Sequence, residues 1–293
     1  MKSLRNMQIF LEVAQLGSIR AAAARLDLSP PAVSMAVAEL QREFGCTLIE
    51  RAGRGIRLTE DGRELESLGR RAMALLEQAK DAVGGDRRAM RLRITAVTTT
   101  AESFVPPLLE SFVRAHPECD VDLDVDNRER LFDRLGHGEV ELAIAGRPPV
   151  SPACRILASR HNDLVIVGAP RSGHADIGTA TWLLRESGSG TRAATRELFA
   201  TLAIAPPVRS VGSNGAVRAC ARAALGISLI SRDAVAGDIE AGQLVILPSP
   251  ATPLARNIHL LASAERTLSR AALRFVAHAV ETGVFATPGV DAM

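Results

Sequence analysis

The apolar and polar positions of segment 17–40 predict two short helices joined by a tight turn. Ser18 precedes an alanine-rich run and Ser29 precedes a pair of prolines, so each serine stands where a helix N-cap belongs. In the second helix apolar residues recur at steps of four, three and four, at Val33, Val37, Leu40 and Phe44. The opposite face carries small or polar residues, namely Ala32, Ser34, Met35, Ala38, Glu39 and Arg42. This pattern is typical of a helix-turn-helix that reads the DNA major groove, and a helical hairpin in any protein core shares its spacing.

The flanking segments extend this first unit. Residues 3–16 read as an amphipathic helix facing the pair, and two short apolar segments around Gly53 and Gly55 predict a β-hairpin, or wing. Thr59 then begins a long helix over 60–83 whose apolar residues recur every three or four positions. Because a helix of that length needs a partner for its apolar stripe, the pattern favours a two-fold dimer.

From Arg91 onward strands and helices alternate. Strands are expected at 91–97, 121–125 and 141–145, with helices at 104–116 and 127–136, and this alternation predicts a parallel sheet. A second unit begins near Asp163 and continues with strands and helices as far as a final helix over 269–282. The expected elements between them lie at 163–168, 182–184, 191–202, 208–211, 216–224, 226–230, 244–247 and 258–262.

Residues 4–58 resemble the winged helix-turn-helix of LysR-type transcriptional regulators. The resemblance rests on 23 residues that match in register, in chain order Phe10, Leu11, Val13, Ala14, Gly17, Ser18, Ala22, Ala23, Leu26, Ser29, Pro31, Ala32, Val33, Ser34, Leu40, Phe44, Gly45, Leu48, Ile49, Arg51, Leu58, Thr59 and Gly62. The remainder is similar to the effector domain of the same family, closest to the branch that regulates carbon-fixation operons. That branch is indicated by Asp126 to Glu129, by the segments 143–149 and 185–192, and by Ser213-Asn214.

The resemblance implies an α/β protein in three parts. Residues 1–58 would form the all-α winged helix-turn-helix with its small β wing, and 59–88 the linker or dimerisation helix and hinge. Residues 89–293 would form a two-lobed effector domain of the periplasmic-binding-protein type 2 kind, with lobe I at about 89–161 and 266–293 and lobe II at about 162–265. The expected function is a DNA-binding regulator whose effector domain binds a small, anionic metabolite that modulates operator binding and transcription.

The predicted DNA contacts lie on the helix pair and the wing. Arginines on the wing can rest on phosphates or enter the minor groove. The predicted set is Ser18, Arg20, Ser29, Pro30, Pro31, Ala32, Ser34, Met35, Ala38, Arg42, Arg51, Arg54 and Arg57. Pro30 and Met35 replace a Gln and an Arg that are usual in the family, which predicts weaker base discrimination at the positions that those residues would meet.

The predicted effector site collects polar residues that follow strands, where open α/β sheets bind ligands. Hydroxyls, glycines and free N–H groups at helix starts suit a carboxylate or phosphate. The predicted set is Thr98, Thr99, Thr100, Asn127, Gly146, Arg147, Ser187, Ser189, Thr191, Arg192 and Asn214. Two residues depart from the branch: Glu102 replaces a usual Lys and Gly215 a usual Glu, and an acidic Glu102 at the cleft entrance would repel a strongly anionic ligand.

Composition excludes other classes. The net charge is +2, with +3 in residues 1–58, so charge alone does not indicate DNA binding. No metal, cofactor or catalytic residue is expected. The four cysteines lack the spacing of metal ligands and are interpreted as buried thiols, with a redox switch as the alternative: they are Cys46, Cys119, Cys154 and Cys220. The six histidines are scattered along the chain, at His116, His137, His161, His174, His259 and His278. Without a leader or membrane span the protein is expected in the cytoplasm, as a homodimer or homotetramer, with RNA polymerase as a further partner.

Two other classes share the effector pattern. A small-molecule binding protein for uptake would have the same lobes, with a signal peptide and no helix-turn-helix. A phosphate-loop enzyme would use residues 185–192, but the segment lacks the GxxxxGK[ST] spacing and no histidine or carboxylate pair accompanies it.

Overall fold

The computed structural model describes residues 2–53, 55–83, 90–150, 154–173, 175–264 and 266–287. These residues fall into two compact units, one of residues 1–87 with 137–139 and the other of residues 88–136 with 140–293. Three features expected from the sequence, Arg54, His174 and the hinge at 84–88, lie outside the described residues. None of the helices among the described residues has the length and apolar character needed to cross a bilayer.

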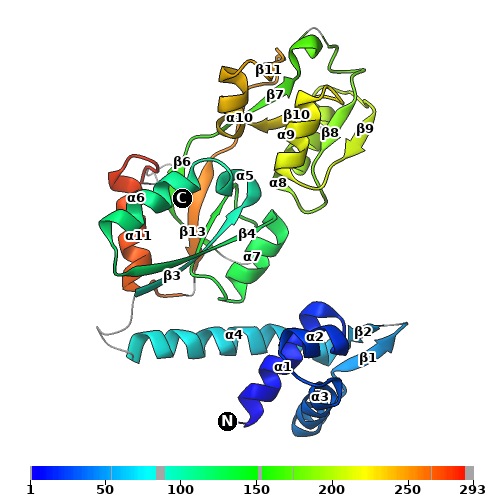
Figure 1. The fold of residues 1–293 in the computed structure, drawn as a ribbon, viewed down its shortest axis with the longest axis vertical. Coiled ribbons are helices and arrows are strands. Elements are labelled where there is room, and N and C mark those ends of the chain that lie inside the picture. The colour runs from blue at the N-terminus through cyan, green and yellow to red at the C-terminus, as the bar shows by residue number, and fades with distance from the viewer. Residues whose placement is uncertain are drawn as a thin grey trace. The chain divides into compact units, whose positions relative to one another are not determined.

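The first unit begins with three packed helices, labelled in Figure 1 as α1 (Lys2–Leu16), α2 (Ile19–Arg25) and α3 (Pro30–Phe44). Ser18 Oγ accepts a hydrogen bond from the amide of Ala21, and Ser29 Oγ accepts one from Ala32, each at 3.3 Å. Both serines are therefore the predicted N-caps, and they fix where α2 and α3 begin. The apolar stripe of α3 packs into a core with α1 and α2 that includes Ile9, Val13, Ala22, Val33 and Val37.

The prediction that the apolar stripe of α3 is buried is wrong for one of its members, Phe44. The side chain of Phe44 is 50% exposed, because α3 ends there and Gly45 turns the chain away in the left-handed conformation with φ 69°. Gly is favoured at this position since it carries no Cβ to clash. The buried stripe of α3 therefore ends at Leu40.

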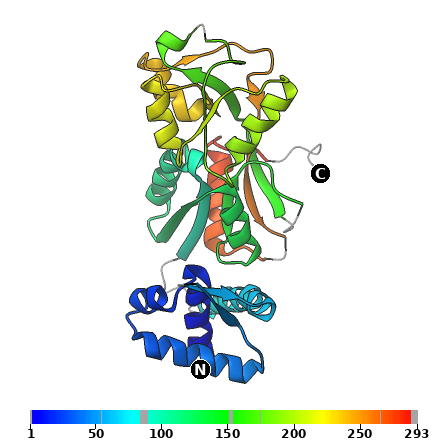
Figure 2. The ribbon, with the colours of Figure 1, turned by 90° about the vertical axis from the view of Figure 1, so that its right-hand side faces the viewer.

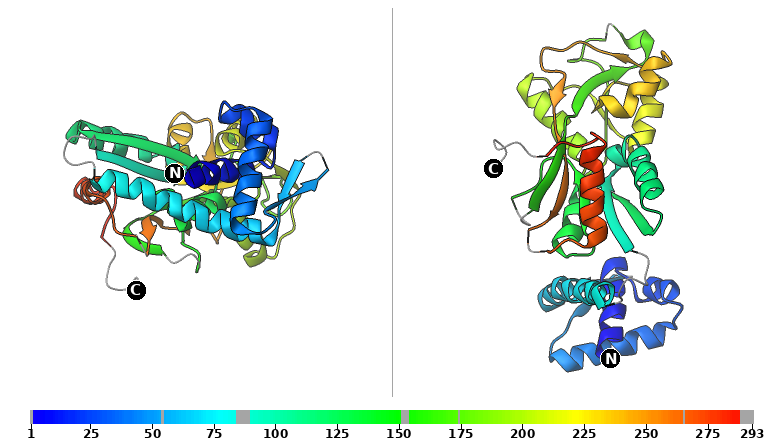
Figure 3. Two further views of the ribbon diagram at one scale, coloured as in Figure 1. Left: turned by 90° about the horizontal axis from the view of Figure 1, so that it is seen from below. Right: turned by 90° about the vertical axis from the view of Figure 1, so that its left-hand side faces the viewer.

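The wing is a two-stranded antiparallel sheet of β1 (Ile49–Ala52) and β2 (Gly55–Leu58), followed by the long helix α4 (Glu60–Val83). Thr59 Oγ1 caps α4 by accepting from the amide of Gly62 at 3.0 Å. A Cβ on Gly62 would lie 2.0 Å from the carbonyl oxygen of Leu48, so only glycine allows α4 to start this close to the strand. Figure 3 shows α4 along its length. Leu68 and Leu75 on this helix are exposed.

The first lobe of the second unit is built on a five-stranded sheet in the order β4-β3-β5-β13-β6. The strands β3, β4 and β5 are parallel, whereas β13 runs antiparallel to both of its neighbours. The strands are β3 (Met90–Val97), β4 (Cys119–Asp126), β5 (Leu142–Ala145), β6 (Cys154–Arg160) and β13 (Ile258–Ser263). The prediction of a parallel sheet therefore holds for three of these strands.

Helices cover both faces of this sheet. Alternate residues of β5 point to opposite faces, so Ile144 packs with α6 (Val105–Ala115) and α11 (Arg270–Glu281), and Ala143 packs with α7 (Arg128–Gly136). Figure 3 shows α11, in red, lying along the sheet. The short helix α5 (Thr98–Ala101) stands where the sequence predicted a turn.

The second lobe, at the top of Figure 2, has antiparallel strands around β7 and a separate parallel pair, β8 and β9. Its elements are β7 (Asp163–Gly168), the 3-10 helix η2 (Pro170–Ser172), β8 (Trp182–Leu184), α8 (Gly190–Thr201), β9 (Val208–Ser210), α9 (Asn214–Arg222), β10 (Ser228–Ser231), α10 (Arg232–Glu240), β11 (Val245–Ile246) and β12 (Leu254–Ala255). The helix α10 was not predicted from the sequence. Because β13 belongs to the first lobe's sheet, the chain leaves the second lobe before Ile258 and not near 265 as expected.

Candidate functional site

The exposed face of the helix pair lies at the beginning of α3. Ser29, Pro30, Pro31, Ser34 and Met35 are exposed there, and Met35 is 65% accessible. Ala38 and Arg42 continue the exposed face along the helix, Ala32 is half-buried, and Arg20 is exposed on α2. Because the capping serines use only an oxygen lone pair to accept from the helix, their hydroxyl hydrogens remain able to donate to a phosphate.

The wing presents two described arginines that differ in their surroundings. Arg51 is exposed, while the guanidinium of Arg57 is paired with Glu50 through Nη2 and Oε1 at 2.7 Å. The amide of Ile56 also donates to the carbonyl of Gly17 at 3.0 Å, which ties the wing to the turn before α2. The wing and the helix pair thus form one rigid surface.

In the second unit a cavity of about 630 Å³ lies between the two lobes. Six arginines and two glutamates are among its lining residues. The polar and charged lining residues are Thr98, Thr99, Asn127, Arg128, Glu129, Arg147, Asn162, Arg185, Ser189, Thr191, Arg192, Arg196, Glu197, Ser231 and Arg256. Arginine is well suited to bidentate binding of carboxylates and phosphates, so the surplus of cations favours an anionic ligand.

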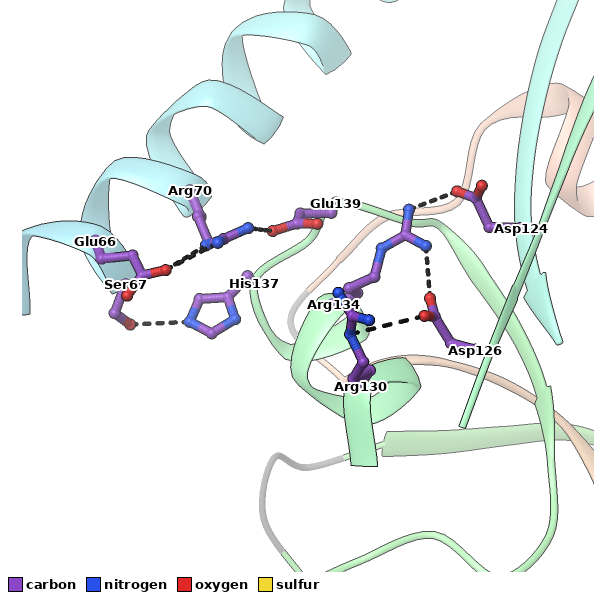
Figure 4. A network of polar contacts seen from close by, with 9 residues as sticks. All are labelled: Glu66, Ser67, Arg70, Asp124, Asp126, Arg130, Arg134, His137 and Glu139. Carbon is purple, nitrogen blue, oxygen red and sulfur yellow. Dashed lines mark hydrogen bonds and ion pairs between the residues drawn. The ribbon is translucent and has the colours of Figure 1, made fainter. Parts of the chain in front are cut away.

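The first lobe positions its part of the lining through the turn between β4 and α7. Asn127 caps α7 by accepting from the amide of Arg130 at 3.0 Å. Arg134 of α7 reaches back to two carboxylates of β4, with 2.8 Å between Nη1 and Asp126 Oδ2, and a second contact to Asp124 (Figure 4). These ion pairs hold the turn, and with it Asn127, at the edge of the cavity.

Figure 4 also shows a polar cluster of the first unit. Arg70 of α4 donates to Glu66 at 2.8 Å and to Glu139 at 2.6 Å, and Ser67 lies 3.2 Å from His137 Nε2. These residues of α4 and of segment 137–139 explain why that short segment belongs to the first unit.

The second lobe contributes the loop that precedes α8. Gly188 has φ 80°, and a Cβ there would lie 2.9 Å from Glu129 Oε2 and 3.0 Å from Asn127 Nδ2. Ser189 is the N-cap of α8, with its Oγ accepting from the amide of Arg192. The loop therefore brings the positive end of α8 to the cavity while packing against the start of α7 in the other lobe.

Four of the six arginines are held by protein groups. Arg185, which is 5% exposed, makes a two-point ion pair with Glu186, at 2.7 Å for both contacts. Arg192 donates to the carbonyl of Arg185 at 2.6 Å, Arg128 donates to the carbonyl of Arg147 at 3.0 Å, and Arg256 pairs with Glu197. Within the described part of the chain, the guanidinium groups of Arg147 and Arg196 make no such contact.

The ion pair of Arg185 changes the titration of its partner. Burial on its own would raise the pKa of Glu186, but the hydrogen bonds and charge of Arg185 outweigh burial and lower it. Glu186 thus stays ionised, and Arg185 stays fixed in the wall of the cavity.

Eight of the eleven predicted effector residues line the cavity, and three do not. The three are Thr100, Ser187 and Asn214. Thr100 is buried and donates to the carbonyl of Val97 at 2.9 Å, Ser187 is exposed, and Asn214 donates to Glu102. Glu102 is also not a lining residue, and its carboxylate accepts the hydrogen bond from Asn214, so its expected repulsion of an anion at the cleft entrance stays a prediction.

Several lining residues were missed by the sequence analysis. Arg196 follows Arg192 by one helical turn on α8, and Arg128 follows Asn127, so both could have been found from the predicted helices. Asn162 and Arg256 come from the two segments that cross between the lobes, and no local pattern marks them. Asn162 Nδ2 donates to the carbonyl of Arg256 at 3.0 Å, which ties these crossings together.

None of the four cysteines is in a disulfide. Only Cys119 is buried, so the expectation of buried thiols is wrong for Cys46, Cys154 and Cys220, which are half-buried. Burial raises the pKa of Cys119 and Cys154, which makes the thiolate less available. In the described part of the chain, no group of three or more His, Cys, Asp or Glu residues is arranged to hold a metal ion.

The arrangement of a winged helix-turn-helix unit and a two-lobed unit with a cavity defines a ligand-responsive DNA-binding protein. Residues 4–63 match the bacterial regulatory helix-turn-helix protein, lysR family, and residues 85–283 match the LysR substrate binding domain. The chain belongs to the LysR family of transcriptional regulators. It is thus a DNA-binding regulator with an effector domain, and its relatives are named as regulators and not as enzymes.

Three comparisons illustrate the relationship. The chain is 34% identical over 288 residues to the HTH-type transcriptional regulator CbbR of Rhodospirillum rubrum, covering 94% of this chain and 95% of that protein. The regulatory domain of CcmR from Synechocystis PCC6803, solved in complex with 2-PG, is 28% identical with a TM-score of 0.61, covering 66% of this chain and 96% of that one. Full-length CbnR, solved with its target DNA, has a TM-score of 0.66 at 22% identity, and the match covers 95% of this chain and 99% of that one. These relatives confirm the expected family and branch.

Proposed function

We propose that the cavity binds a small dianionic metabolite that carries a phosphate or carboxylate group, and that this ligand controls operator binding. The observation that carries the proposal is the excess of positively charged side chains around a cavity of about 630 Å³, where six arginines stand against two glutamates. That volume falls within the range of about 300–1,000 Å³ typical of small-molecule sites. The start of α8 adds backbone N–H groups to the same wall.

The relatives support a phosphorylated ligand. The CcmR domain, which is similar to this chain, was solved with 2-PG, which we take as 2-phosphoglycolate. The presence of Glu102 in place of the usual Lys argued against such an effector, but Glu102 stands outside the lining and is engaged by Asn214. A phosphorylated acid therefore suits the cavity on charge and on size.

At the other end of the chain we assign operator contact to the exposed start of α3 and the wing. Residues 1–58 would read DNA, 59–88 would pair two protomers and 89–293 would bind the effector. A homodimer, or a tetramer made of two dimers, would place two helix-turn-helix heads on a pseudo-palindromic operator. The protein would act in the cytoplasm and contact RNA polymerase there.

The names of the relatives suggest the target. The regulators from Rhodospirillum rubrum and Allochromatium vinosum are named CbbR and RuBisCO operon transcriptional regulator, with 34% and 33% identity. We infer that this chain controls an operon of carbon metabolism next to its own gene. The control arises because the ligand binds one arrangement of the oligomer more tightly than another, which shifts the occupancy of the operator.

The ligand is tested by calorimetric titration of the full-length chain with 2-phosphoglycolate, glycolate and inorganic phosphate. Arg192→Ala is expected to weaken 2-phosphoglycolate binding by about tenfold or more, because a charge-assisted hydrogen bond contributes about 1.5–3 kcal/mol. Arg232→Ala, on the exposed first turn of α10, is the matched control and should bind as the unchanged chain does. Absence of binding to all three anions, or equal losses in both variants, would contradict the proposed ligand.

A further inference from the structure

A hydrogen bond joins the two lobes at a point outside the cavity lining. The side-chain amide of Asn214 donates through Nδ2 to Glu102 Oε2 at 2.8 Å. Glu102 follows α5 in the first lobe, and Asn214 is the first residue of α9 in the second lobe. These residues are 112 positions apart in sequence, so folding alone brings them together.

The surroundings of this bond make it stronger than an ordinary surface contact. Asn214 is 1% exposed, so its amide would lose its hydrogen bond without gaining water if the partner were removed. The carboxylate of Glu102 also lies at the N-terminus of α9, where Ser213 caps the helix and the helix dipole favours negative charge. Both effects favour the arrangement in which the two lobes meet.

The bond also lies next to an element that lines the cavity. Thr98 and Thr99, at the start of α5, line the cavity, and Glu102 follows at the other end of the same short helix. A separation of the lobes at Asn214 would therefore also displace the α5 wall of the cavity from α8. A second contact between the lobes is made by Gly188, which packs against Asn127 and Glu129.

We propose that Glu102 and Asn214 form an interlobe latch that holds the effector domain closed and thereby sets its affinity for anions. The inference rests on the proposed function of the cavity. Neither residue touches the ligand; both are positioning residues. If the latch is lost, the closed form becomes a smaller fraction of the population, and the apparent dissociation constant rises by the inverse of that fraction.

The first test is a double-mutant cycle on the full-length chain. The variants are Glu102→Ala, Asn214→Ala and the combination, titrated with 2-phosphoglycolate. Each single variant is expected to raise the dissociation constant about five- to thirtyfold, and the double variant no further, because both remove the same bond. Glu102→Gln, which keeps an acceptor oxygen but not the charge, should fall between the unchanged chain and Glu102→Ala. Losses that add in the double variant would overturn the latch.

The second test needs no ligand and so separates this inference from the proposed function. Hydrogen exchange of the amides of residues 213–218 is measured in the unliganded chain. Glu102→Ala, a change in the first lobe, is expected to speed exchange in this second-lobe segment severalfold. Glu240→Gln changes the charge at an exposed site on α10 and should leave it unchanged. Equal exchange in Glu102→Ala and the unchanged chain would overturn the latch even if 2-phosphoglycolate binds.

Asn214 is buried, so its variant also needs a folding control. The melting temperature of Asn214→Ala is measured beside that of Glu102→Ala, whose site is exposed. If Asn214→Ala unfolds, the Glu102 variants and the exchange of residues 213–218 still decide the question.

Discussion

Glu50 and Arg57 lie directly opposite one another on the two strands of the wing, and Arg57 Nη2 approaches Glu50 Oε1 to 2.7 Å. Both side chains are largely exposed, at 47% and 71%. The pair therefore contributes little to stability, since exposed ion pairs are typically worth less than about 1 kcal/mol. It does reduce the positive charge that this part of the wing can offer to a phosphate, whereas Arg51 forms no ion pair with any residue that the structure describes.

We expect the two wing arginines to differ in DNA binding. Arg51→Ala should lower affinity for a promoter duplex and reduce the slope of log affinity against log salt by about one, as for the loss of a single phosphate contact. Arg57→Ala should lower affinity less, and Glu50→Gln should raise it. Fluorescence anisotropy at several salt concentrations measures this, with Arg209→Ala of the effector unit as control. Identical slopes for all variants would contradict wing contact.

The exposed start of α3 should carry weak base preference. Pro30 and Met35 offer no hydrogen-bonding side chain to a base edge, so discrimination depends on Ser34 and on apolar contact with thymine methyl groups. Pro30→Gln and Met35→Arg are expected to sharpen the preference at the base pairs that they meet, by about 1–3 kcal/mol for a good bidentate contact. Binding to a set of operator variants measures this, and an unchanged preference would refute it.

Gly62 should be essential for the stability of the DNA-binding unit. Its Cβ in Gly62→Ala would lie 2.0 Å from the carbonyl oxygen of Leu48, which is backbone and cannot rotate away. Overpacking of this kind costs about 1–3 kcal/mol, so the unfolding transition of this unit should move to lower temperature. Gly237→Ala is the control: this helical glycine has open space around its Cβ site, and the change should be neutral or stabilising. A Gly62→Ala protein as stable as the unchanged chain would contradict this packing.

The substitution Gly188→Ala should lower both ligand affinity and stability. An alanine there meets both a positive φ of 80° and Glu129 Oε2 at 2.9 Å across the lobes. The left-handed backbone costs about 1–2 kcal/mol in any arrangement of the lobes and lowers stability. The clash with Glu129 arises only where the lobes meet, and a cost of about 1.4 kcal/mol there should weaken 2-phosphoglycolate binding about tenfold. Gly215→Ala, where a Cβ meets nothing, serves as the control. Affinities are measured by calorimetry. Equal affinities of Gly188→Ala and Gly215→Ala for 2-phosphoglycolate would contradict a role of the Gly188 contact in ligand binding.

His259 should make the effector unit less stable in acid. Burial lowers the pKa of His259, whose Nδ1 lies 2.8 Å from Ser159 Oγ. The unfolded chain therefore binds a proton more readily than the folded chain, and stability falls as pH drops below about 6.5. His259→Gln should flatten this dependence between pH 7 and 5, because the variant has no group at this position that titrates in that range. The measurement is the melting temperature of each protein across that pH range. Parallel curves of melting temperature against pH for His259→Gln and the unchanged chain would contradict the role given to His259.

The parts predictable from sequence were those determined by neighbouring residues. Ser18 and Ser29 mark helix starts by local hydrogen bonds, and the stripe of α3 follows from its period, so the helix-turn-helix could be identified directly. Within the cavity, Thr98 and Ser189 were predictable because each lies in a polar segment between a predicted strand and a predicted helix. The known family pattern added Asn127.

The parts that could not be predicted depend on distant pairing. A run of buried residues such as β7 shows that a strand exists but not which way its partner β10 runs. Arg256 reaches the cavity because it lies on one of two crossing segments that are joined at Asn162. Asn214 was assigned to the effector site because it lies between a predicted strand and a predicted helix, and its hydrogen-bond partner Glu102 could not be found because it lies far away in sequence. The helix α10 was not predicted because its nine residues have only a weak helical periodicity of apolar positions.

The return of β13 to the middle of the first sheet has a consequence for biosynthesis. This strand lies between β5 and β6, yet the ribosome makes it after everything from Asp163 to Ala255. The sheet of the first lobe therefore stays incomplete, without its strand between β5 and β6, while the second lobe is synthesised and folds around β7. A nascent chain halted before Ile258 would expose the unpaired edges of β5 and β6, which are the kind of edges that invite aggregation.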